Sequence, residues 1–300
     1  MNEVEHGSGA GTPAAGPSLT RVRSGAVELV VERDGQGPAI VLAHGLTATR
    51  RYVVQGSRLL QRSGLHVVSY DARGHGESTP APDRRAYEYA DLVGDLGNLL
   101  DACEVERAVL AGSSMGAATT LAYALEQPER VAGLVQITPA HLGIPHTDPH
   151  DLGRWDELAD AVEGAGVDGF MRVYGDPPVD RRFKSLVLKA IRQRLERHRN
   201  LSAVADAMRV VPRSVAFDGP DMLEYVEPPT LVVASLDDLD PEHPYSVAQL
   251  YAERIPRAEL VSEEPGSTPL AWRGGSLSRA ILAWLDRIGI ERGAPAAPLR

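Results

Sequence analysis

Short apolar runs alternate with amphipathic stretches along the first half of the chain. Four runs are continuously apolar, which is typical of strands buried on both faces of a sheet, at Ala39–Ala43, 65–70, 108–111 and 131–138. The stretches between them, at 51–62, 87–103 and 115–126, favour helices, and an early strand is expected at 27–32. Strands that alternate with helices predict an α/β fold, with a mostly parallel sheet flanked by helices on both faces.

The pattern changes after Pro139. From 141 to 226 no buried-strand run occurs, and apolar residues at helical spacing favour helices instead. Strand patterns return at Thr230–Ala234 and 259–262, before a last amphipathic helix. We therefore predict one α/β core, residues 19–140 and 227–292, that is interrupted by a helical cap at 141–226. Residues 1–18 and 293–300 are poor in large apolar side chains and are expected to be disordered tails.

Composition and net charge narrow the possible partners. The chain has 300 residues and a net charge of −10, which argues against nucleic acid or an anionic membrane because both require a concentrated positive face. The single cysteine, Cys103, excludes an internal disulfide framework. No apolar run reaches the ~18–20 residues that span a bilayer, and residues 1–20 lack a signal-peptide pattern, so we expect a cytoplasmic protein. The sequence carries no signal for an oligomeric state.

The sharpest motif is Gly112-Ser113-Ser114-Met115-Gly116, a G-x-S-x-G sequence between a predicted buried strand and a predicted helix. In that context it is typical of a nucleophile elbow, a tight turn that lifts the serine hydroxyl above the sheet. The alternative is a simple helix-capping turn. We expect Ser114 to be the nucleophile, with the backbone N–H of Met115 facing the space where an oxyanion would form.

Two glycine-containing segments follow the neighbouring strands. His44-Gly45-Leu46 comes directly after Ala39–Ala43, and the backbone N–H of Leu46 is the expected second donor of an oxyanion hole. The segment 71–78 (DARGHGES) follows the strand at 65–70. Its glycines indicate a tight loop, in which Arg73 and His75 are expected to be structural rather than catalytic.

With these segments the chain resembles the α/β-hydrolase family, in particular its capped members. The resemblance covers residues 25–288 and rests on HG at 44–45, DARGHGES at 71–78, GSSMG at 112–116 and PERV at 128–131. It implies Ser114 as nucleophile, an acid after Thr230–Ala234 and a histidine after the strand at 259–262. Asp240 best matches the acid, because the stretch DPEHP at 240–244 fits the family's D-P-x-x-P pattern, and Asp238 is the alternative.

The histidine that the resemblance implies is absent. Where the family has P-G-x-G-H-x-P, this chain has PGSTP at 265–269, with Ser267 or Thr268 in place of the base, and no histidine follows His243. A serine without a base is a weak nucleophile at neutral pH. One interpretation is that another histidine acts on Ser114. His243, three residues beyond Asp240, is the first candidate, followed by His141, His146 and His150.

Two further interpretations remain open. The oxyanion hole could serve a lyase, isomerase or cyclase reaction without an acyl-enzyme, or the chain could be an inactive relative that binds a small ligand. We favour a cofactor-independent enzyme that hydrolyses a small ester or lactone through Ser114. Fold alone does not decide among these, because unrelated reactions occur on one fold.

The cap is expected to control access of a small-molecule substrate to the site. The candidate pocket residues are His44, Gly45, His141, Trp155 and Tyr174. Residues 181–199 are strongly basic on an acidic chain, which indicates either attraction of an acidic substrate or, as we favour, a solvated helix face with acidic neighbours. No cofactor or metal site is predicted, because the sequence has no phosphate-binding glycine loop, dinucleotide motif or metal-ligand cluster.

Overall fold

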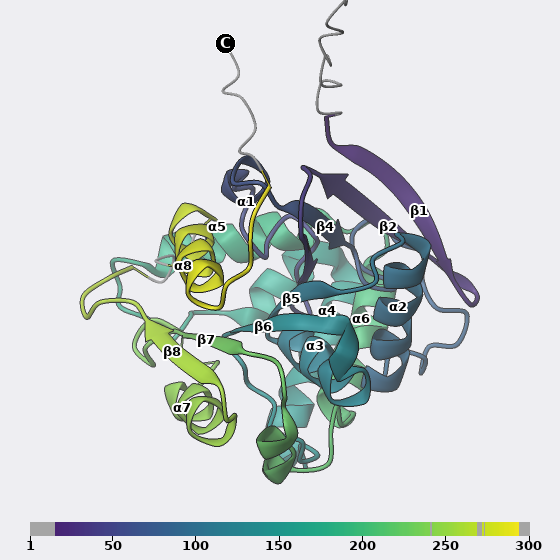
Figure 1. Cartoon of the computed structure of the whole chain (residues 1–300). Helices are drawn as coiled ribbons and strands as arrows, with labels where there is room; N and C mark the ends of the chain where they lie inside the picture. Colours follow the sequence, from purple (N-terminus) through teal and green to yellow (C-terminus); the bar gives the residue numbers. More distant parts are fainter. Residues whose placement is uncertain (1–15, 241, 269–271, 273, 294–300) are drawn as a thin grey trace, which may run out of the picture.

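The computed structural model describes residues 16–240, 242–268, 272 and 274–293, which form an α/β structure around one sheet. The sheet has eight strands in the order β1-β2-β4-β3-β5-β6-β7-β8 (Figure 1). The pairs β1–β2 and β2–β4 are antiparallel, and all other neighbours are parallel. The predicted fold class is therefore confirmed. The strands are β1 (Ser18–Ser24), β2 (Val27–Asp34), β3 (Ala39–Ala43), β4 (His66–Tyr70), β5 (Ala108–Ser113), β6 (Val131–Ile137), β7 (Thr230–Ala234) and β8 (Ala258–Ser262).

The edge strand β1 has no counterpart in the apolar pattern of the sequence. Only Val22 and Ser24 of its seven residues are buried, because β1 pairs with β2 alone and faces solvent along most of its length. Ser18, which was assigned to the N-terminal tail, is the first residue of β1. Gly293, assigned to the C-terminal tail, donates a backbone hydrogen bond to the Gly64 carbonyl at 3.0 Å. The predicted tail residues 1–15 and 294–300 lie outside the described residues.

Alternate residues of the central strands pack into two apolar layers. Ile40 and Leu42 of β3 share one cluster with side chains of α1 (Leu59–Arg62) and α8 (Gly274–Arg287). Val41 and Ala43 share the other with α2 (Tyr89–Ala102), α3 (Met115–Glu126) and α7 (Tyr245–Arg254). Helices therefore cover both faces of the sheet (Figure 1), which explains why its central strands are continuously apolar.

Helices, and no strand, lie between β6 and β7. They are α4 (Pro149–Tyr174), α5 (Lys184–Leu195) and α6 (Leu201–Val210), followed by short 3-10 turns. The Asp148 side chain caps α4 by accepting the His150 N–H at 2.8 Å, and α4 bends at Ala165 and Gly166, whose dihedral angles are not helical. α4 and α6 pack together through the same apolar cluster that contains α2 and α3. None of the helices in the described ranges combines the length and apolarity needed to cross a bilayer.

Truncation of a large core side chain tests this layered packing. Trp284 on α8 is fully buried, and its ring lies only 2.8 Å from where a Cβ on Gly133 of β6 would stand. Trp284→Ala should therefore leave a cavity and lower the free energy of unfolding by about 3–5 kcal/mol. The control is Tyr225→Ala, at a side chain that is 69 % exposed, and it should change the free energy of unfolding by less than about 0.5 kcal/mol. Urea unfolding followed by circular dichroism measures both, and equal losses would contradict the packing described.

Candidate active site

The G-x-S-x-G motif forms a sharp turn between β5 and α3, as predicted. Ser114 stands at the turn with φ 51° and ψ −112°, a left-handed backbone that is unusual for a residue with a side chain. A Cβ on Gly112 would lie 2.1 Å from the Gly116 carbonyl oxygen, and one on Gly116 would lie 2.2 Å from that of Ala43. Both positions therefore require glycine, and α3 begins in direct contact with the end of β3.

The backbone alone positions Ser114. Its N–H donates to the Ile137 carbonyl at 3.0 Å, and its carbonyl accepts the Ala118 N–H at 3.1 Å. The side chain is half-buried, and within the described ranges its hydroxyl makes no hydrogen bond. In this conformation no described histidine holds the hydroxyl.

Two backbone donors lie beside the elbow. Gly45 approaches it closely, because a Cβ there would stand 3.5 Å from the Ser114 Cβ. Neither the Leu46 N–H nor the Met115 N–H donates a hydrogen bond to any residue that the structure describes. Met115 is the first residue of α3, where N–H groups lack intrahelical partners and the helix dipole is positive. The two segments that meet at Ser114 thus supply unpaired donors, as an oxyanion hole requires.

His44, a candidate pocket residue, is only 2 % exposed and has both ring nitrogens bonded to backbone. Its Nδ1 donates to the Gly45 carbonyl at 2.8 Å, and its Nε2 accepts the Ala72 N–H at 2.9 Å. Burial lowers the pKa of His44 to about 3, with a smaller contribution from the neighbouring His75. The neutral ring therefore joins the loops after β3 and β4 and has no free nitrogen for proton transfer.

His198 connects the helical insertion to the same two loops. The Gly76 N–H donates to its Nδ1 at 2.9 Å, so that Nε2 carries the proton and faces the Thr47 carbonyl at 3.2 Å. Burial lowers the pKa of His198 to about 3. His75 lies between the other two rings, with centroid distances of 5.1 Å to His44 and 5.6 Å to His198. Three buried imidazoles thus form a row that runs from the loop after β3 to the insertion.

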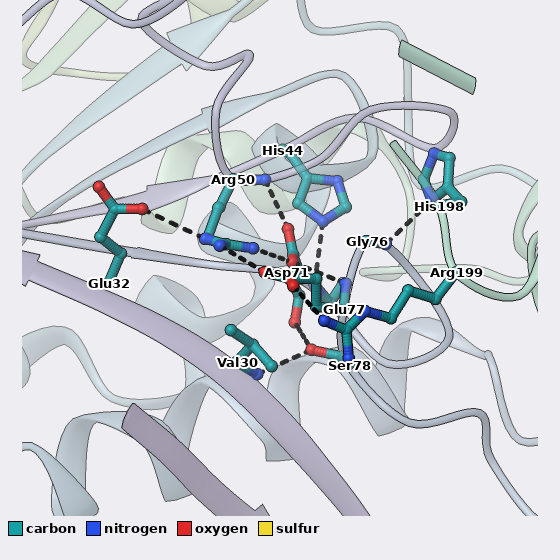
Figure 2. A network of polar contacts seen from close by, with 11 residues as sticks. Val30, Glu32, His44, Arg50, Asp71, Gly76, Glu77, Ser78, His198 and Arg199 are labelled. Carbon is teal, nitrogen blue, oxygen red and sulfur yellow. Dashed lines mark hydrogen bonds and ion pairs between the residues drawn. The ribbon is translucent and has the colours of Figure 1, made fainter. Parts of the chain in front are cut away.

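Figure 2 shows the polar network centred on Asp71, the first residue after β4. The fully buried carboxylate accepts the backbone N–H of Arg50 at 2.8 Å and that of Glu77 at 2.9 Å, and it pairs with the Arg50 guanidinium. Glu77 pairs in turn with Arg50 at 2.7 Å and with Arg199 of the insertion at 2.6 Å. A Cβ on Gly76 would stand 2.2 Å from the Asp71 carboxylate, so this loop also requires glycine.

Asp240 and His243 form a hydrogen-bonded pair in the loop after β7. The Asp240 Oδ2 atom lies 2.9 Å from His243 Nδ1, and the side chains are 31 % and 21 % exposed. Burial would lower the pKa of His243, but the Asp240 carboxylate and, more weakly, Glu242 raise it above its usual value. The other nitrogen, Nε2, makes no hydrogen bond within the described residues. The pair is therefore a carboxylate-oriented imidazole with one free nitrogen.

The other aspartates of this loop have different surroundings. Asp237 accepts the Tyr245 N–H at 2.7 Å and so caps the start of α7. Asp238 is exposed. Of the three aspartates, Asp240 is the one with a hydrogen bond to an imidazole. Pro241 lies outside the described residues.

A buried carboxylate, Glu263, follows β8 directly, in the segment that leads to the expected histidine position. It is 8 % exposed, and it accepts the Leu236 N–H and the Trp272 indole N–H, each at 3.0 Å. These bonds join the loops after β7 and β8. No motif in the sequence indicates Glu263, because its partner Leu236 comes from the loop after β7. Further along, the Ser267 N–H donates to the Glu264 carbonyl at 3.1 Å in a turn.

The other candidate bases are less available than His243. His141 Nε2 accepts the Ala216 N–H at 3.1 Å, and burial lowers the pKa of His141 to about 4. His146 and His150 are exposed on the surface of the insertion. The described residues include no group of three His, Cys, Asp or Glu side chains that could hold a metal ion.

Tyr174, at the end of α4, reaches the loop that contains Asp240 and His243. Its hydroxyl donates to the Glu242 carboxylate at 3.2 Å, and burial raises its pKa. Trp155, on the same helix, is half-buried against the main apolar cluster. Of these two candidate pocket residues, Tyr174 is the one with a polar contact to the loop after β7.

Comparisons with known proteins identify the family of the chain. The family model described as alpha/beta hydrolase fold matches residues 38–267. The sn-1-specific diacylglycerol lipase of Mus musculus is 32 % identical over 164 residues, which are 47 % of this chain and 52 % of the lipase, so the chain spans about half of that relative. A Caulobacter sp. (strain K31) protein provisionally named carbamate hydrolase is 30 % identical to this chain. The match covers 80 % of this chain and 88 % of the length of the Caulobacter protein. A hydrolase structure from Pseudomonas aeruginosa has a TM-score of 0.70 at 28 % identity, covering 89 % of this chain and 98 % of its own.

The buried histidines should make the protein sensitive to acid. In the folded protein His44, His141 and His198 stay neutral because their pKa values are lowered to about 3 or 4. In the unfolded chain the same histidines have their ordinary pKa of 6.5 and bind a proton once the pH falls below it. Stability is therefore lost as the pH falls from 6.5 towards 4. Each of these histidines should lower the free energy of unfolding by about 2 kcal/mol when the pH falls from about 7.5 to 5.

His198→Gln isolates one of these contributions. Its loss of unfolding free energy between about pH 7.5 and 5 should be smaller than that of the native protein by about 2 kcal/mol. His150→Gln, at a side chain that is 91 % exposed, is the control and should follow the native protein. Denaturant unfolding at the two pH values measures both variants. An unchanged pH dependence in His198→Gln would show that this imidazole is not held neutral.

Proposed function

The chain belongs to the alpha/beta hydrolase fold family, and we propose that it is a cofactor-independent serine hydrolase that cleaves a small ester or lactone. The observation that carries the proposal is the hydrogen bond between Asp240 and His243, because it provides an oriented imidazole in place of the missing histidine. The elbow at Ser114 and its two unpaired N–H donors support the same reaction. The name of the mouse relative, a diacylglycerol lipase, supports an ester as substrate.

In the proposed reaction, the Ser114 Oγ atom attacks the substrate carbonyl carbon while His243 Nε2 takes the hydroxyl proton. The developing oxyanion accepts hydrogen bonds from the N–H groups of Leu46 and Met115. His243 then gives the proton to the leaving alkoxide, and the C–O bond breaks to leave an acyl-enzyme. Water, deprotonated by the same imidazole, attacks this ester and releases the acid, which restores Ser114.

Asp240 has the role of the orienting carboxylate. Its bond to Nδ1 sets the tautomer in which Nε2 is the free base, and its charge stabilises the imidazolium that forms. Strands β5, β6 and β7 are parallel neighbours, so the loop with this pair and the elbow lie at the same edge of the sheet. Ser114 makes no hydrogen bond to His243 in the free protein, so the proposed reaction requires the two side chains to come within hydrogen-bond distance when substrate binds.

Covalent labelling tests the roles of Ser114 and His243. A fluorophosphonate probe should label the native protein at Ser114, and Ser114→Ala should abolish labelling. His243→Gln should reduce kcat/KM for p-nitrophenyl acetate by about 10²–10⁴-fold, because the attack loses its general base. His146→Gln, at an exposed histidine, is the control and should retain native activity.

Other outcomes would favour the remaining interpretations. A protein that is not labelled but still converts a carbonyl substrate without hydrolysis would be a lyase, isomerase or cyclase. A protein that is neither labelled nor active towards esters and lactones, yet binds small ligands, would be a binding protein. Native activity in His243→Gln would remove His243 from the mechanism.

The pH dependence of the reaction tests the pairing of Asp240 with His243. Only the neutral imidazole accepts a proton, and the carboxylate raises the pKa of His243 above 6.5, so kcat/KM should fall as the pH drops through a midpoint above that value. Asp240→Asn removes the charge, so it should move the midpoint to lower pH and reduce the maximum rate. Rates measured from about pH 5 to 9 check both effects. An identical midpoint in Asp240→Asn would show that the carboxylate does not act on the catalytic imidazole.

A further inference from the structure

The hydrogen bonds of the peptide group between Gly45 and Leu46 determine where the Leu46 N–H points. The Gly45 carbonyl accepts two hydrogen bonds, from the Ala48 N–H at 2.9 Å and from His44 Nδ1 at 2.8 Å. The peptide is trans, so its carbonyl and its N–H point in opposite directions. Two donors fix the carbonyl and thereby direct the N–H to the opposite side, where it bonds to no residue that the structure describes.

A second peptide group, between Thr47 and Ala48, connects this carbonyl to the helical insertion. Its N–H is the Ala48 donor, and its carbonyl oxygen lies 3.2 Å from His198 Nε2. Nε2 carries the proton, because Nδ1 accepts the Gly76 N–H at 2.9 Å (Figure 2). His198 therefore donates to the Thr47 carbonyl, and a continuous series of hydrogen bonds runs from the imidazole through two peptide groups to the Leu46 N–H.

Both polar groups of the Gly76 backbone fix the imidazole in place. The N–H of Gly76 donates to His198, and its carbonyl accepts the backbone N–H of Arg199 at 2.9 Å. Burial lowers the pKa of His198 to about 3, so the tautomer with a proton on Nε2 persists at neutral pH. A fixed donor of this kind orients the peptide groups that follow it, and each accepted hydrogen bond strengthens the next N–H donor by roughly 10–30 %.

The series of hydrogen bonds ends at the elbow. Gly45, which shares a peptide group with the Leu46 N–H, is so close that a Cβ on it would stand 3.5 Å from the Ser114 Cβ. An oxyanion donor is effective when it is aimed at the developing charge before the reaction begins. We propose that His198 is a positioning residue, which holds the Leu46 N–H in the direction that the oxyanion requires by donating to the Thr47 carbonyl. This role rests on the proposed function, since it concerns the oxyanion hole of that same site.

Two substitutions of His198 separate the two hydrogen bonds of its ring. The amide of His198→Gln reaches as far as Nε2 and can still donate to Thr47. The shorter amide of His198→Asn reaches only as far as Nδ1, so it keeps an acceptor for the Gly76 N–H and loses the donor. With p-nitrophenyl acetate, His198→Asn should lower kcat about 10-fold and leave KM within about twofold, because the Leu46 N–H is misdirected but not removed. His198→Gln should retain kcat within about threefold.

Arg199→Gln is the matched control for a loosened insertion. It removes the ion pair between Arg199 and Glu77, at 2.6 Å, and leaves the imidazole and Thr47 unchanged. Its kcat and KM should stay within about twofold of the native values. Equal losses of kcat in His198→Gln and His198→Asn, or a loss in Arg199→Gln as large as that in His198→Asn, would overturn the role of the Nε2 donor. So would native kcat in His198→Asn.

Hydrogen exchange of the Ala48 N–H, followed by NMR, requires no activity and so separates this role from the proposed function. Exchange should be faster by at least about threefold in His198→Asn, and His198→Gln should restore the native rate. In a protein that hydrolyses no ester, this pattern would still support the positioning of the loop, and equal exchange in all three proteins would overturn it. In an active enzyme, faster exchange with native kcat in His198→Asn would overturn the role of His198 and leave the hydrolase intact.

Discussion

The close approach of α3 to the end of β3 is the constraint on which the site depends. Gly116 leaves no room for a side chain against the Ala43 carbonyl, and Gly112 leaves none against Gly116. With both glycines in place, the chain turns from strand to helix at Ser114 in a left-handed conformation and brings the first N–H groups of α3 beside the loop that contains Leu46. A larger residue at either glycine would move the helix away and separate the hydroxyl from the donors that the proposed reaction needs.

Buried polar contacts hold the surrounding loops in register with the elbow. The carboxylate of Asp71 joins the loops after β3 and β4, and the imidazoles of His44 and His198 each join two segments through their ring nitrogens. These groups are tolerated in the interior because each has its hydrogen-bonding partners. His198 and Arg199 belong to the helical insertion, so their contacts with the loops after β3 and β4 also position the insertion. The covering helices and the elbow are therefore parts of one connected structure.

The fold was largely predictable because its signals are local. Continuous apolar runs identify the strands that are covered on both faces, and the spacing of glycine and serine identifies the elbow. β1 escaped prediction because an edge strand has few buried residues. Glu263 was not predicted because its contacts include a residue from a segment distant in sequence, the loop after β7. The sequence could name His243 as a candidate from its distance to Asp240, but not which aspartate it contacts.

The sequence by itself determined the order of strands and helices, the glycine-dependent elbow and the absence of a histidine after His243, because each depends only on residue identity and spacing. The tertiary structure decided which ionisable groups are free to act. Most of the histidines near the site are bonded to backbone or buried neutral, while His243 retains one free nitrogen beside a carboxylate. Burial and hydrogen bonding set the protonation and availability of a side chain, and both depend on partners that folding brings from elsewhere in the chain.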